Sequence, residues 1–247
     1  VRQKEVKRTP APPFTTSTLQ QEASRRLSFS PKRTMSVAQR LYEGADTPDG
    51  HVGLITYMRT DSTALAGVAM GEAREVIGER YGEPYTMPKG RVYKTKSKGA
   101  QEAHESVRPT SFRRDPDTMA PFLKSDEARL YRLIWQRALA SQMAPKELET
   151  TTIELADGSY ELRASATKVL FDGFAIVYTE GRDDASGDDD DEAGASPVAS
   201  VSAARARTGR DGGHLAKGAV EHHDHVVADH ARFRAAAGRL RRQRCRL

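Results

Sequence analysis

Gly53-Leu-Ile-Thr-Tyr-Met-Arg-Thr-Asp-Ser62 joins an apolar run to a cluster of polar and charged groups, and no other ten residues are as informative. Leu54 and Ile55 are typical of a short buried strand, and Asp61 or Ser62 has a side-chain oxygen that can cap a following helix. The pattern therefore predicts a strand-to-helix turn. Such a turn would hold Tyr57 close to exposed helix amides, which favour an anion.

Tyr57 and Arg59 form the first candidate site. A phenol, whose pKa is ordinarily about 10, is a poor nucleophile at neutral pH unless a nearby cation stabilises its oxyanion or the phosphate that it attacks. Arg59 lies two residues further on, and its planar guanidinium suits two phosphate oxygens. The alternative is a half-buried strand tyrosine beside an ordinary surface charge. For an arbitrary Tyr-x-Arg, that alternative is the commoner case.

Three stretches of the chain, taken in order, resemble the type IA family of bacterial DNA topoisomerase I. They are Pro13-Phe-Thr-Thr-Ser-Thr-Leu-Gln-Gln-Glu-Ala-Ser24, Leu54–Ser62, and Ala100-Gln-Glu-Ala-His-Glu-Ser-Val-Arg-Pro109. The resemblance runs from about residue 13 to about residue 182. It implies that Tyr57 attacks a phosphodiester of single-stranded DNA, which gives a 5′-phosphotyrosyl link and a free 3′-hydroxyl. The other strand then passes through the gap, and the 3′-hydroxyl reseals the break.

The same resemblance implies roles for further groups. Arg59 would bind the scissile phosphate, and His104 would contact phosphate as a DNA-binding residue, although a lone histidine is more often structural. Complete family members hold Mg²⁺ through an acidic cluster in an N-terminal domain that these residues do not include, so we expect no metal ligands here and an inactive isolated chain. The partner would be the single-stranded segments of negatively supercoiled DNA, and we expect a monomer.

A second interpretation belongs to a different class of protein. The chain could be a non-catalytic DNA-binding module, a helical domain with a basic tail that binds DNA without cutting it. The two interpretations differ at Tyr57, because an enzyme's phenol must reach phosphorus, whereas a binder's phenol would be buried or would stack on a base.

Bulk composition is compatible with both interpretations. The 247 residues allow one or two domains, and a net charge of +5 permits nucleic-acid binding without proving it. No apolar run approaches the roughly 20 residues that span a bilayer, and the opening residues are too polar for a signal peptide. The single cysteine, Cys245, fits a reducing compartment. We therefore expect a cytoplasmic, nucleoid-associated protein without a membrane partner.

Apolar periodicity predicts an α+β fold in four parts. These are a connector at 1–13, an α-rich tyrosine-bearing domain at 14–143, a partial β-rich arch segment of the type IA topoisomerase fold at 144–182, and at 183–247 an acidic loop followed by a disordered C-terminal tail. We expect helices near 34–43, 62–82 and 125–143, and strands near 150–155, 160–166 and 174–178. The predicted core contains Leu19, Leu41, Leu65, Val68, Ile77, Leu130, Ile134 and Trp135.

The last segment, 193–247, differs from the rest in composition. It contains ten arginines, one lysine, five of the seven histidines and one aromatic residue, Phe233. A shifted reading frame and a genuine basic tail that binds nucleic acid both explain such a mixture. Its His222-His223-Asp224-His225 could bind a metal by composition, although no scaffold supports a specific site. The basic loop 89–98 could follow a DNA backbone or could be solvated surface.

Overall fold

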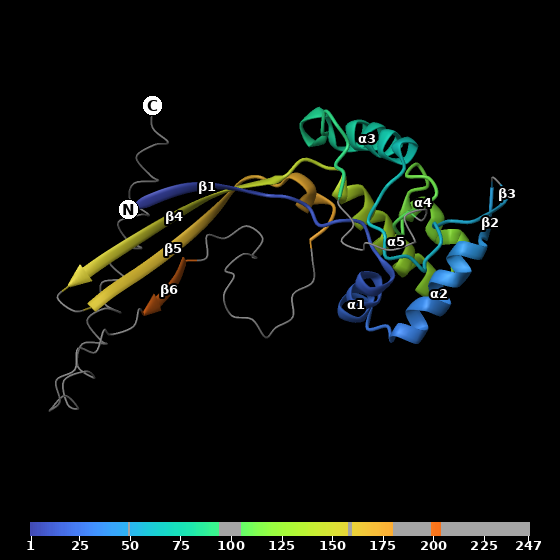
Figure 1. Ribbon diagram of the computed structural model, residues 1–247, viewed down its shortest axis with the longest axis horizontal. Helices are drawn as coiled ribbons and strands as arrows, with labels where there is room; N and C mark the ends of the chain where they lie inside the picture. Colours follow the sequence, from blue (N-terminus) through green and yellow to red (C-terminus); the bar gives the residue numbers. More distant parts are fainter. Residues whose placement is uncertain (49, 94–104, 158–159, 180–198, 204–247) are drawn as a thin grey trace, which may run out of the picture. The chain divides into compact units, whose positions relative to one another are not determined.

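The computed structural model describes residues 1–48, 50–93, 105–157, 160–179 and 199–203, which combine helices with an antiparallel sheet. The α+β class is therefore confirmed (Figure 1). The described helices are α1 (Thr16–Leu27), α2 (Pro31–Glu43), α3 (Gly67–Tyr81), α4 (Pro116–Met119) and α5 (Ser125–Ser141). The described strands are β1 (Arg2–Arg8), β2 (Ala45–Thr47), β3 (Gly50–Val52), β4 (Lys146–Asp157), β5 (Tyr160–Phe171) and β6 (Ala199–Ala203).

Helices α2 and α5 confirm two of the predictions. The Ser30 hydroxyl accepts a hydrogen bond from the Arg33 amide at 3.3 Å, and Pro31 occupies the first turn of α2, where its missing N–H costs nothing. Gly44 ends α2 with a φ of 116°, a value that favours glycine. On α5, Trp135 is buried as predicted, and its indole N–H donates to the Phe112 carbonyl at 3.0 Å.

Helix α3 begins later than the sequence predicts. Its first residue is Gly67, its N-cap is Ala66, and no side chain caps it. The predicted cap at Asp61 or Ser62 is wrong, because the Ser62 hydroxyl instead accepts the Ala64 amide in a local turn at 3.1 Å. The later start also changes the buried face of the helix. Val68 was predicted to be in the core but is 88% exposed, and the buried residues of α3 are Ala69, Ala73, Val76 and Ile77.

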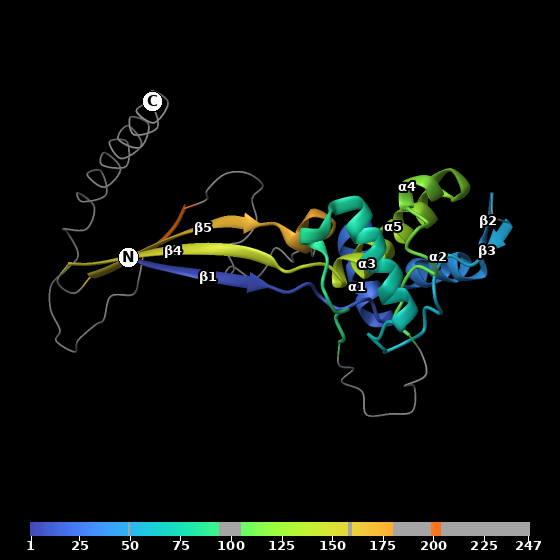
Figure 2. The same cartoon turned by 90° about the horizontal axis from the view of Figure 1, so that it is seen from above.

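The four-stranded sheet has the order β1-β4-β5-β6, with every neighbouring pair antiparallel. Strands β1, β4 and β5 lie side by side in both views (Figures 1 and 2). Arg2–Arg8 were expected to be part of a connector, yet they pair with Thr152–Lys146, and Lys7 forms an ion pair with Glu147 at 2.6 Å. A charged edge strand shows no apolar alternation, which explains why the sequence pattern missed it.

Two further differences concern the β-rich part. Residues 173–176, which overlap the strand expected at 174–178, form a 3₁₀ turn. Strand β6 falls within the segment expected to be a disordered tail, and its backbone pairs with Leu162–Ala166 of β5. The rest of that tail, including the histidines and Phe233, lies outside the described residues, so the predictions for it stay predictions.

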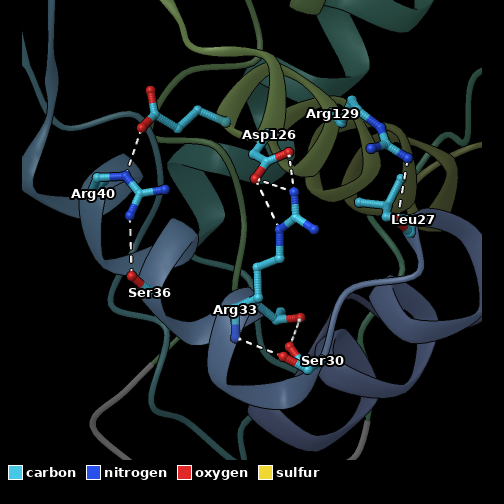
Figure 3. A network of polar contacts seen from close by, with 9 residues as sticks. Leu27, Ser30, Arg33, Ser36, Arg40, Asp126 and Arg129 are labelled. Atoms are coloured by element: carbon cyan, nitrogen blue, oxygen red, sulfur yellow. Dashed lines mark hydrogen bonds and ion pairs between the residues drawn. The ribbon is translucent and has the colours of Figure 1, made fainter.

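Polar contacts hold α2 against α5 (Figure 3). The Arg33 guanidinium donates to both carboxylate oxygens of Asp126, at 2.7 to 3.0 Å. Arg40, near the end of α2, donates to Glu127 at 2.7 Å and to the Ser36 hydroxyl at 3.1 Å. Bidentate pairs are the more specific kind of ion pair, so these contacts fix how α2 lies on α5.

A buried polar network joins the end of the β-rich segment to the helices. Tyr178 is 3% exposed, and its hydroxyl donates to the Glu22 carboxylate of α1 at 2.9 Å. Arg137 of α5 donates to the Tyr178 oxygen at 3.3 Å and to the Pro12 carbonyl at 2.7 Å. Burial raises the pKa of Tyr178, so this phenol keeps its proton at neutral pH.

Removing the Tyr178 hydroxyl should therefore destabilise the protein. We expect Tyr178→Phe to lower the free energy of unfolding by about 1–3 kcal/mol, because the buried Glu22 carboxylate loses a donor. Urea unfolding followed by circular dichroism measures the change. Tyr81→Phe is the control, since the described structure gives the Tyr81 hydroxyl no hydrogen bond. Equal losses in the two variants would contradict the role of the network.

Candidate functional site

The tyrosine segment, residues 54–62, has buried residues on both sides of an exposed phenol. Leu54, Ile55 and Met58 are at most 1% exposed, whereas Tyr57 is 40% exposed. The Thr56 amide donates to the Arg108 carbonyl at 2.9 Å, and the Thr110 amide donates to the Leu54 carbonyl at the same distance. The predicted short buried strand is thus present as an isolated antiparallel bridge between Ile55 and Pro109. It brings together the second and third of the quoted stretches.

The first quoted stretch joins the same assembly through the start of α1. The Thr16 hydroxyl donates to the Met58 carbonyl at 2.8 Å and accepts the Thr60 amide at 2.8 Å. The Thr16 amide donates to the Thr60 carbonyl at 2.9 Å, and Val107 donates to Phe14 at 2.8 Å. Three segments that are distant in sequence therefore meet around Tyr57.

The helix beside the tyrosine segment is not the predicted one. The sequence pattern predicts that the helix after Ser62 begins next to Tyr57, but α3 begins only at Gly67. The first turn of α1 takes its place, since Thr16 contacts residues on both sides of Arg59. Sequence reasoning missed Thr16, although it lies within the quoted stretch Pro13–Ser24. Its partners are more than 40 residues away, and no local pattern reveals them.

Arg59 and Tyr42 are two described groups that bear on the chemistry of Tyr57. The Arg59 side chain is exposed, and no salt bridge to it occurs within the described residues. The rings of Tyr42 and Tyr57 meet edge to face, with centroids 5.4 Å apart and an interplanar angle of 67°. Tyr42 is 42% exposed, so the two phenols form an accessible aromatic pair.

The other candidate residues are only partly covered. His104 lies outside the described residues, and its phosphate role stays a prediction. Its neighbour Glu105 forms an ion pair with Arg108. In the basic loop, the Arg91 backbone amide donates to Gln142 at 2.9 Å, so at least this residue is tied to the fold.

The acidic and histidine side chains of the described residues are spread over the surface and the core without gathering at one point. Within the described ranges, no group of three or more His, Cys, Asp and Glu side chains could hold a metal ion. The Mg²⁺ that the family resemblance implies therefore has no ligand set among these residues. No helix in the described part of the chain is long and apolar enough to cross a membrane.

Comparison with known proteins now adds to this geometry. The sequence profile of the DNA topoisomerase family matches residues 1–205. The chain belongs to the DNA topoisomerase I family. It is 54% identical over 200 residues to DNA topoisomerase 1 of Xylella fastidiosa strain 9a5c, and equally to that of strain Temecula1. Each alignment covers 80% of this chain but only 24% of the relative, so the chain spans about a quarter of their length.

A solved topoisomerase I has the same fold. Full-length topoisomerase I from Thermotoga maritima, in a monoclinic crystal form, matches with a TM-score of 0.63 and 40% identity, over 81% of this chain and 32% of that one. The topoisomerase profile also continues to residue 205, past residue 193, where the composition of the chain changes. Strand β6 lies within this extension.

The Thr16 hydroxyl should stabilise the topoisomerase segment around Tyr57. We expect Thr16→Val, which keeps the shape but removes the hydroxyl, to lower the free energy of unfolding by about 1–3 kcal/mol. The reason is that the Thr60 amide loses its acceptor and the Met58 carbonyl loses a donor. Urea unfolding measures this, with Thr86→Val as the control because its exposed hydroxyl makes only a local bond to Glu83. A loss no larger than that of the control would show that Thr16 is unimportant.

Proposed function

We propose that this chain supplies the nucleophile of a type IA DNA topoisomerase, which relaxes negatively supercoiled DNA by cutting and resealing one strand. The observation that carries the proposal is the contrast at Tyr57. Its phenol is 40% exposed, while the neighbours at 54, 55 and 58 are buried and the backbone on both sides is hydrogen-bonded. A fixed backbone with an accessible hydroxyl is what a nucleophile requires.

The proposed step balances as a transesterification. The Tyr57 oxygen attacks phosphorus in single-stranded DNA and loses its proton, while the bond from phosphorus to the 3′-oxygen breaks. The 3′-oxygen takes up a proton and leaves as a hydroxyl, and the 5′-phosphate stays on the tyrosine. After strand passage, the 3′-hydroxyl attacks the phosphotyrosine and restores both the phosphodiester and the phenol.

Arg59 is proposed to bind the phosphate that is attacked. Charge develops on the phosphate oxygens in the transition state, and a preorganised guanidinium stabilises it. The exposed side chain of Arg59 and the absence of an ion pair to it among the described residues support this role. His104 is proposed as a further phosphate contact. The proposal places the Mg²⁺ ligands of the complete enzyme in the N-terminal domain that the family resemblance implies.

Removing the Tyr57 hydroxyl tests the proposal. The experiment uses a chimaera in which residues 1–205 replace the matching segment of the Xylella fastidiosa enzyme. Incubation with a labelled single-stranded oligonucleotide should give a covalent adduct through the 5′-phosphate, detected on a denaturing gel. Tyr57→Phe should abolish the adduct and leave oligonucleotide binding intact, because only the nucleophilic oxygen is lost.

The control for that variant is Tyr85→Phe, which also removes one hydroxyl, here one bonded to Asp172 at 2.8 Å. It should still form the adduct. An adduct that survives Tyr57→Phe would assign the nucleophile to another residue. A parental chimaera that binds the oligonucleotide but never cuts it would favour the non-catalytic DNA-binding module.

The guanidinium of Arg59 should matter beyond its charge. Arg59→Lys keeps the positive charge but loses the planar fork, so we expect cleavage to slow by roughly tenfold or more. Single-turnover cleavage by the chimaera measures the rate. Arg74→Lys, at an exposed arginine on α3, should leave it unchanged. Parental cleavage by Arg59→Lys would make Arg59 an ordinary surface charge.

A further inference from the structure

The Tyr42 ring lies against the proposed nucleophile and comes from an element that is itself held firmly. Arg40 binds Glu127 of α5 at 2.7 Å, and Leu41 is 1% exposed in the core. These neighbours fix the last turn of α2 from two sides. Tyr42, the next residue, projects from that turn and presents its ring to Tyr57.

Backbone contacts then tie this turn directly to the tyrosine segment. The Leu54 amide donates to the Leu41 carbonyl at 2.8 Å. A side chain at Gly53 would place a Cβ atom 2.8 Å from the Tyr42 carbonyl oxygen, which is closer than real Cβ atoms come. Glycine at 53 thus permits the close approach of two backbones, and that approach sets the spacing between Tyr42 and Tyr57.

The short hairpin β2–β3 lies between the two tyrosines in sequence. Its His51 contacts the last turn of α2. His51 contacts the Glu43 carbonyl at 3.1 Å and Asp46 at 2.8 Å. The hydrogen bond with Asp46 raises the pKa of His51 most, and the bond with the Glu43 carbonyl raises it further. The two ends of the segment from Tyr42 to Tyr57 therefore lie together, with the Tyr42 ring in contact with the Tyr57 ring.

Given the proposed function, we infer that Tyr42 is a positioning residue for Tyr57. The backbone around Tyr57 is fixed, but the side-chain torsions of a 40% exposed phenol are not fixed by burial. The edge-to-face contact restricts the direction in which the Tyr57 oxygen points. A nucleophile misplaced by about 1 Å loses much of its rate, so holding the ring contributes to cleavage rather than to DNA affinity.

The first test uses the chain itself and needs no activity. In the parent, the ring current of Tyr42 should shift the Tyr57 ring signals in a ¹³C-tyrosine NMR spectrum, with Tyr57→Phe providing the assignment. Tyr42→Leu should move these signals, and Tyr42→Phe should move them little. Tyr57 signals that are the same in Tyr42→Leu and in the parent would overturn the inference, whatever becomes of the proposed function.

The second test separates positioning from DNA binding in the chimaera. We expect Tyr42→Leu to slow single-turnover cleavage at saturating oligonucleotide by roughly 3- to 10-fold, with the Kd for the oligonucleotide unchanged within about twofold. Tyr42→Phe should cleave at the parental rate, because it keeps the ring. Phe122→Leu is the matched control, since Phe122 is 41% exposed and has a similar size.

Three outcomes of the second test would overturn the inference. In one, Tyr42→Leu cleaves at the parental rate. In another, it weakens the Kd but not the saturated rate, which would make Tyr42 a platform that stacks on a base. In the third, Tyr42→Phe is as slow as Tyr42→Leu, which would assign the effect to the hydroxyl. Failure of the proposed function is distinguishable, because it appears as an adduct that survives Tyr57→Phe.

Discussion

The hydrogen bond from the Leu54 amide to the Leu41 carbonyl, 2.8 Å long, is the contact on which the arrangement around Tyr57 depends. It joins the end of α2 to the start of the tyrosine segment, and Gly53 makes it possible by having no side chain. Thr16 performs the corresponding task at the other end of the segment, where its hydroxyl bonds to residues 58 and 60. The backbone before Tyr57 is therefore held by α2, and the backbone after it is held by α1.

These hydrogen bonds on both sides of Tyr57 explain how an exposed side chain can have a defined position. The backbone on both sides of the phenol is held, since the Thr56 amide bonds to Arg108 and the Met58 carbonyl accepts from Thr16. Arg33 and Arg40 bind acidic residues of α5 and so keep α2 in register with the core (Figure 3). Rigid elements hold a site more precisely than mobile loops do, which suits chemistry at a single atom.

Much of the fold follows from local sequence signals, and the departures have physical causes. Helices α2 and α5 were predictable because apolar spacing and end signals agree. The start of α3 was not, since Ser62 had a local turn as an alternative to capping. Strand β1 has charged, exposed side chains and owes its conformation to pairing with β4 more than 130 residues away.

For the candidate site, the sequence predicts which residues take part but not which residues they contact in the fold. The string around Tyr57 and Arg59 identified the family, and the family profile confirms it. The contacts of Thr16 and Tyr42 join positions 15 to 44 residues apart, and no periodic pattern encodes such a pairing. Tyr42 in particular is 42% exposed, so its contact with Tyr57 is not part of the buried face of its helix.

Mapping the covalent bond to one tyrosine tests the central claim most directly. The chimaera is trapped with an oligonucleotide under denaturing conditions, and nuclease and trypsin then leave a peptide from Leu41 to Arg59 that contains both Tyr42 and Tyr57. Fragment-ion mass spectrometry assigns the nucleotide to one of them. The account predicts a nucleotide linked through its 5′-phosphate to Tyr57. A nucleotide on Tyr42, or on any residue outside this peptide, would contradict it.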